Sequence, residues 1–103
     1  MIKDKVIELG WQSEGYYCNR ELFSLSKDSK FSIFEHNEWG ILDPFSKDLN
    51  LIYCDLTDEE LINYTSLVKT YDDIISNPKD HTLYSYQEAT KDIYNFIKKL
   101  KEK

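Results

Sequence analysis

The sequence predicts an α+β fold: a short N-terminal helix, an antiparallel β-meander of four or five strands, and two C-terminal helices packed on one face of the sheet. Two observations lead to this fold class. Apolar residues recur with a period of about two over residues 16–54 and of about 3.6 over residues 56–100. Two capping boxes, at Thr57–Glu60 and Ser85–Glu88, mark the starts of two helices after the strands. Because 103 residues is a common domain size, we expect residues 1–103 to form one domain.

The first predicted element is a short N-terminal helix. Ile2, Val6 and Leu9 recur at helical spacing and are followed by Gly10 and Trp11. Gly10 suits the left-handed position that ends a helix, and Trp11 would then pack back on Val6. A helix of about two turns is only marginally stable alone in water, so its apolar side must pack against the rest of the domain.

The strands follow. Residues 16–18 open the run, and residues 22–25 and 31–34 flank a polar turn at residues 27–30. Facing Phe23 with Ile33, and Leu25 with Phe31, makes one face of this hairpin uniformly apolar, which fixes the register. Residues 39–42 and 51–54 supply the remaining strands.

The second helix begins at a strong local signal. Thr57 and Glu60 form a capping box, and Leu56 and Leu61 form the matching hydrophobic staple. Its predicted apolar stripe is Leu61, Tyr64, Val68, Tyr71 and Ile75.

The third helix is predicted from a second capping box at Ser85 and Glu88. Lysines crowd its C-terminal end, where the helix dipole favours cations. Its predicted apolar stripe is Ala89, Ile93, Phe96, Ile97 and Leu100.

The charge is unevenly distributed. The net charge is −6, and residues 35–73 hold ten of the 19 acidic residues but only two of the 13 basic ones, Lys47 and Lys69. Such a field repels nucleic acid and anionic membranes and attracts a basic protein. The alternative is a solvated surface, because acidic residues also suit helix first turns and loops.

The partner-binding surface is predicted from this acidic segment together with one aromatic residue. Trp39 follows a turn, and a place in the core is favoured over one at a surface rim. The predicted contact residues are Glu35, Glu38, Trp39, Asp43, Asp48, Asp55, Asp58, Glu59, Asp72 and Asp73.

The cysteines and the N-terminus point to a reducing compartment. Cys18 and Cys54 each lie in a strand-like apolar stretch, so we expect buried free thiols. The first residues lack the apolar core of a signal peptide, and no apolar run approaches the roughly 18 residues that span a bilayer. We therefore expect a cytoplasmic protein without membrane attachment.

Familiar catalytic and metal-binding patterns are missing from the sequence. His36 and His81 are the only histidines, the cysteines lack nearby ligand partners, and the three glycines are isolated. We expect no metal, no small-molecule cofactor and no enzymatic activity.

These properties together predict a small acidic inhibitor that binds a basic effector one to one, such as a nuclease toxin, in the manner of immunity proteins and antitoxins. A phage-encoded inhibitor of a host defence nuclease, of the anti-CRISPR kind, is an alternative with the same properties. A small enzyme with an unmarked histidine or carboxylate site near His36 is another, and a structural subunit with a solvated acidic face is a third.

Overall fold

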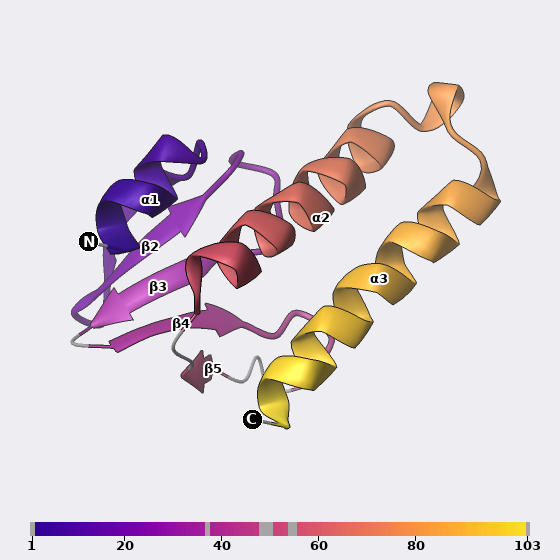
Figure 1. Ribbon diagram of the computed structural model, residues 1–103. Helices are drawn as coiled ribbons and strands as arrows, with labels where there is room; N and C mark the ends of the chain where they lie inside the picture. The colour runs from indigo at the N-terminus through magenta and orange to yellow at the C-terminus, as the bar shows by residue number, and fades with distance from the viewer. Residues whose placement is uncertain (1, 37, 48–50, 54–55, 103) are drawn as a thin grey trace.

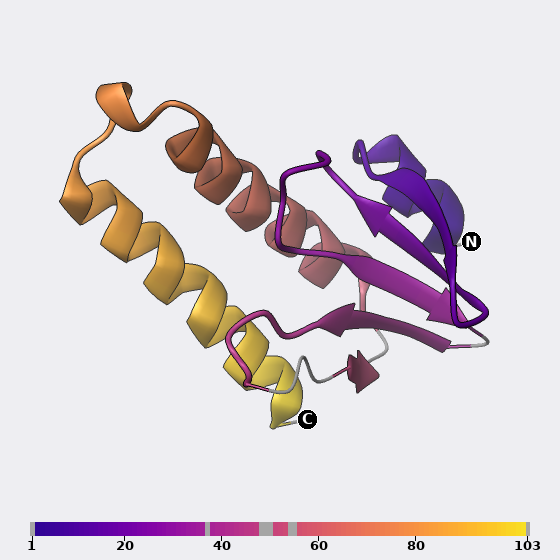
Figure 2. The same cartoon turned by 180° about the vertical axis from the view of Figure 1, so that it is seen from behind.

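The computed structural model describes residues 2–36, 38–47, 51–53 and 56–102 and confirms the predicted α+β architecture (Figure 1). All three α-helices lie on one face of a five-stranded sheet, and the opposite view has the sheet in front of them (Figure 2). The helices are α1 (Ile2–Glu8), α2 (Asp58–Ser76) and α3 (Leu83–Lys101), with a short 3₁₀ helix η1 (Pro78–Asp80). The strands are β1 (Gln12–Tyr17), β2 (Arg20–Ser24), β3 (Ile33–His36), β4 (Glu38–Leu42) and β5 (Leu51–Tyr53).

The sheet is an antiparallel meander with strand order β1-β2-β3-β4-β5. The predicted pairing of Phe23 with Ile33 is confirmed, and it continues to Ile41 and Ile52 as one apolar row beneath the helices. The predicted partners Leu25 and Phe31 lie just outside β2 and β3. On the opposite face Gly40 leaves room for Phe34: a Cβ atom there would lie 2.6 Å from Phe34 Cζ and 2.4 Å from the Ile52 carbonyl oxygen.

Helix α1 ends as the sequence predicts. Gly10 has φ +104°, and its N–H donates to the Ile7 carbonyl oxygen at 3.0 Å. The Trp11 N–H donates to the Val6 carbonyl oxygen at 3.2 Å, which completes a Schellman motif. Trp11 and Val6 are both fully buried, so this turn delivers the indole into the core.

Helix α2 has the predicted capping box, with both Thr57–Glu60 hydrogen bonds formed. The predicted apolar stripe is wrong at its end: Ile75 is half exposed and Ile74 is buried instead. Thr65 is also buried, because its hydroxyl accepts a hydrogen bond from Trp11 Nε1 at 2.8 Å and donates to the Leu61 carbonyl oxygen.

Helix α3 begins three residues earlier than predicted. Its N-cap is Thr82, whose hydroxyl oxygen accepts the Ser85 N–H at 3.1 Å. Ser85 therefore lies inside the first turn, because Thr82 is an equally good capping residue and allows three more residues to join the helix. The predicted stripe is confirmed, with Phe96 only partly buried.

The first hairpin corrects the prediction for Cys18. β1 begins at Gln12, and its turn consists of Cys18 and Asn19, with φ of 52° and 65°. Two left-handed residues make a tight turn that matches the twist of the flanking strands. Cys18 is therefore an exposed free thiol at a turn, whereas Cys54 lies outside the described residues.

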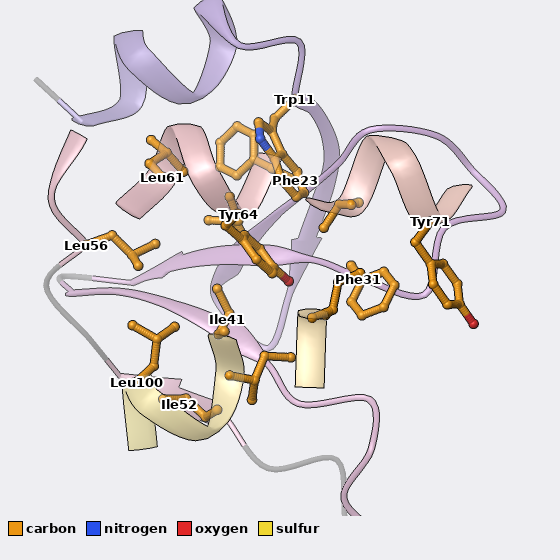
Figure 3. Close-up of a cluster of buried hydrophobic side chains, with 14 of the residues drawn as sticks. Trp11, Phe23, Phe31, Ile41, Ile52, Leu56, Leu61, Tyr64, Tyr71 and Leu100 are labelled. Carbon is orange, nitrogen blue, oxygen red and sulfur yellow. The ribbon is translucent and has the colours of Figure 1, made fainter. Parts of the chain in front are cut away.

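The core fills the space between sheet and helices (Figure 3). Trp11 stacks on Tyr64 with ring centroids 5.8 Å apart, and Tyr64 stacks on Phe96 at 5.3 Å. These three rings link the end of α1, helix α2 and helix α3 into one layer, which fixes the helices over the sheet. No helix of the described residues combines the length and apolarity that a membrane crossing requires.

Candidate protein-binding surface

The C-terminal ends of β1 and β3 and the N-terminal ends of β2 and β4 lie side by side at one end of the sheet (Figures 1 and 2). Tertiary structure gathers aromatic and acidic residues there that are distant in sequence. We call this surface the hairpin end and define it by Tyr16, Tyr17, Glu21, Glu35, Glu38 and Trp39.

Four of these residues form a row across four strands. Tyr16 pairs with Glu21, Glu21 with Glu35, and Glu35 with Trp39. Directly paired side chains in antiparallel strands lie about 4.5–5.5 Å apart at Cβ. The row therefore presents two adjacent carboxylates with an aromatic residue on each side.

Glu21 is fixed within this row. Its side chain accepts hydrogen bonds from Ser13 Oγ at 2.8 Å and from Lys3 Nζ at 3.2 Å, although the residue is only 8% exposed. The Ser13 hydrogen bond, followed by the bond and charge of Lys3, lowers the pKa of Glu21 against the opposing effect of burial. The carboxylate is therefore ionised at neutral pH.

Glu35 carries the available negative charge. It faces Glu21 directly but is only partly buried, and none of the described residues forms an ion pair with it. Like charges in facing positions repel each other, and the single ammonium of Lys3 serves two carboxylates. This excess negative charge favours a further cation beside Glu35.

Trp39 lies partly in the core and partly at the surface, so both locations that the sequence allowed for it apply. One side of its ring stacks on buried Phe23, with centroids 5.7 Å apart and planes at 30°. The residue is nevertheless only partly buried. A rigid indole beside a carboxylate suits the methylene stem and charged head of a lysine or arginine.

The hairpin end continues onto the uncovered face of the sheet. Tyr17 and Glu38 lie on that face and are exposed, Tyr17 to 71%. Tyr16, on the helix-covered face, is 75% exposed because it lies at the end of the sheet. Tyr16, Tyr17 and Glu21 are not among the contact residues predicted from the sequence. The signal that could have indicated them is Cys18-Asn19 between two strand-like runs, which is compatible with the tight turn that presents them.

Asp43 is removed from the predicted surface by its burial. It is 1% exposed, its Oδ1 accepts the Phe45 N–H at 3.0 Å, and its Oδ2 pairs with Lys101 Nζ. Its role is to hold the loop after β4 against the end of α3. Asp48 and Asp55 lie outside the described residues.

The remaining predicted acids are separated along α2. Asp58 and Glu59 are exposed in its first turn, next to the lysine-rich end of α3, since Glu60 and Lys99 line one groove of about 410 Å³. Asp72 and Asp73 lie about 20 Å further along the helix, at 1.5 Å per residue. Of the predicted contact residues that the structure describes, it gathers only Glu35, Glu38 and Trp39 at the hairpin end.

Two titratable carboxylates outside the hairpin end, Asp72 and Asp73, have interactions within the fold. Asp73 Oδ2 lies 3.1 Å from His81 Nε2, and Asp73 Oδ1 accepts a hydrogen bond from Asn77 Nδ2. The carboxylate therefore stabilises the turn after α2. Burial raises the pKa of Asp72, which a Ser29 hydrogen bond partly offsets. The part of the chain that the structure describes holds no group of three or more His, Cys, Asp or Glu arranged for a metal ion.

Comparisons of the chain with protein-family models, with curated proteins and with solved structures find no match.

Proposed function

We propose that this protein is a small non-catalytic inhibitor that binds a basic effector protein one to one through the hairpin end, in the manner of an immunity protein or antitoxin. The observation that carries the proposal is the row Tyr16–Glu21–Glu35–Trp39, in which an excess carboxylate lies between aromatic residues. A lysine or arginine of the partner would lie against Glu35 and along Trp39.

Long-range and short-range forces act together in this proposal. The net charge of −6 steers a basic partner and speeds its association. Exposed aromatic residues then bury apolar area at the contact, which slows dissociation. The tight Cys18–Asn19 turn holds Tyr17 in place beforehand, so little conformational entropy is lost on binding.

A phage-encoded inhibitor of a host defence nuclease would use the same surface and differ only in its partner. The partner's identity, obtained from a complex isolated from the native host, separates these two inhibitors. The enzyme alternative is an unmarked histidine or carboxylate site, to be sought first near His36, whose side chain lies outside the described residues.

The test compares two charge reversals in the complex with the captured partner. Glu35→Lys should slow association at low ionic strength by about tenfold, which corresponds to about 1.4 kcal/mol. The difference should shrink as salt screens the charges. Stopped-flow fluorescence measures the association rate, and circular dichroism confirms that the variant is folded.

Asp92→Lys is the matched control, because Asp92 is exposed on α3 away from the hairpin end. If both reversals slow association equally, net charge alone accounts for the effect and Glu35 has no special role in the contact. An unchanged rate for folded Glu35→Lys at low salt would refute the hairpin end as the contact surface.

A further inference from the structure

Five aromatic rings form a continuous row where the β2–β3 and β4–β5 loops meet the two long helices. Adjacent centroids along the row lie 5.8, 5.1, 6.1 and 5.7 Å apart. The rings come from two loops and two helices, in the order Tyr86, Tyr71, Phe31, Phe45 and Tyr94. This row lies at the opposite end of the strands from the hairpin end.

One ammonium group lies over three of these rings. Lys30 Nζ is 4.9 Å from the centroid of Tyr71, 5.3 Å from Phe45 and 5.8 Å from Phe31. All three distances are within the range of about 6 Å for a cation–π interaction. Although the chain is acidic, no carboxylate of the described residues forms an ion pair with Lys30. The three aromatic rings, together with the Tyr71 hydroxyl with which Lys30 also interacts, therefore replace a carboxylate as its counterpart.

We call the rings of Phe31, Phe45 and Tyr71 around Lys30 Nζ the cage. These rings are held in place by contacts that do not involve Lys30. Phe31 is fully buried and meets Tyr71 edge to face, with planes at 86°. Figure 3 shows Phe31 beside Tyr71, whose hydroxyl points away from the core. Tyr86 and Tyr94 extend the row toward solvent, at 36% and 50% exposure. An arriving cation therefore meets aromatic surface on its way to the cage.

The backbone of the loop is held independently of the lysine side chain. The Ser29 N–H donates to the Ser26 carbonyl oxygen at 3.3 Å, and the Phe31 N–H donates to Ser29 Oγ at 3.3 Å. The Lys30 side chain is exposed overall. Its head group can leave the rings without loss of these bonds.

We infer that Phe31, Phe45 and Tyr71 form a binding site for an alkylammonium head group, which Lys30 occupies in the free chain. Another ammonium replaces Lys30 in the cage, either from the lysine or methylated lysine of a bound protein or from a small quaternary amine. The attraction is the interaction of a cation with three ring faces, and methyl groups on the nitrogen add apolar contact with them. This site is separate from the hairpin end and does not depend on the inhibitor proposal.

The experiment titrates Lys30→Ala with tetramethylammonium chloride and follows the aromatic resonances of Phe31, Phe45 and Tyr71 by NMR. The empty cage should bind the cation about two- to fivefold more tightly than the wild-type cage, as expected for loss of one competing cation–π contact at an exposed site. Sodium chloride at equal concentration controls for ionic strength. A trimethyllysine peptide and choline, titrated separately, distinguish a protein source of the ammonium from a small-molecule source.

Lys27→Ala is the matched variant, because Lys27 is an exposed lysine of the same loop and should leave the affinity unchanged. Lys30→Ser provides a second empty cage if the alanine variant is unstable. Adding Phe45→Leu to either should abolish the gain. Equal affinities of wild type and a folded Lys30 variant, or a gain that survives Phe45→Leu, would overturn the inference.

Discussion

At the scale of single residues, the unusual position is Glu21, a nearly buried carboxylate on the helix-covered face of the sheet. Burial of a charge is unfavourable unless it is paired and hydrogen-bonded. Lys3 from α1 and Ser13 from β1 meet both requirements, and they hold Glu21 beside Glu35. The same contacts that stabilise the fold thus keep Glu21 ionised beside Glu35.

The lowered pKa of Glu21 makes its contribution to stability depend on pH. A carboxylate whose folded pKa lies below its ordinary value of 4.5 stabilises the fold above that value. This stabilisation is lost as the pH falls through the folded pKa. Wild type should therefore lose stability on acidification more steeply than Glu21→Gln, with the two converging at low pH.

Urea denaturation between about pH 2 and pH 7 measures this difference. Glu38→Gln is the control, because Glu38 is exposed on a neighbouring part of the same surface. Parallel pH profiles for wild type and Glu21→Gln would contradict the assigned role of Glu21.

At the scale of elements, the helix boundaries follow from local chemistry, but the choice between two adjacent caps does not. Thr57 is a cap in both sequence and structure. At α3, Thr82 and Ser85 both precede the apolar stripe, and the structure selects Thr82. The turn η1 brings the chain to Thr82 in an extended conformation, which suits an N-cap.

Substitution of the two α3 candidates separates these roles. Thr82→Ala should lower the free energy of unfolding by about 0.5–2 kcal/mol, because the Ser85 N–H loses its acceptor. Ser85→Ala should cost less, since it removes only a hydroxyl contact of 3.1 Å with Thr82. Chemical denaturation of both variants measures the difference, and a larger loss for Ser85→Ala would show that the helix starts at the later position in solution.

At the scale of the whole molecule, folding redistributes the charge of the sequence. The lysine-rich end of α3 returns to the acidic first turn of α2, where Glu60 and Lys99 share a groove. Lys101 also pairs with buried Asp43, which ties the end of α3 to the loop after β4. The described acidic residues between positions 35 and 73 are therefore partly neutralised, and they do not form one continuous surface.

Lys101→Met tests this long-range tie. Asp43 would stay buried without its ammonium partner, so the free energy of unfolding should fall by about 1–3 kcal/mol. Lys98→Met is the matched control in the same last turn. Lys98 lines one cavity of about 250 Å³ together with Asp43 and Lys101, but it forms no ion pair with the described carboxylates. If thermal melts give both variants equal stability, the ion pair with Lys101 is not needed to stabilise buried Asp43.

The sequence was enough to predict the fold class, the Schellman end of α1, the cap of α2 and the pairing of Phe23 with Ile33, because each depends on local chemistry or on a strict two-residue period. The candidate binding surface, in contrast, depends on how the strands pair in three dimensions. Tyr16, Glu21, Glu35 and Trp39 come from four strands, so their row follows from the sheet register rather than from sequence spacing. Burial of Asp43 and exposure of Cys18 likewise follow from a helix end and a turn that local patterns do not place in space.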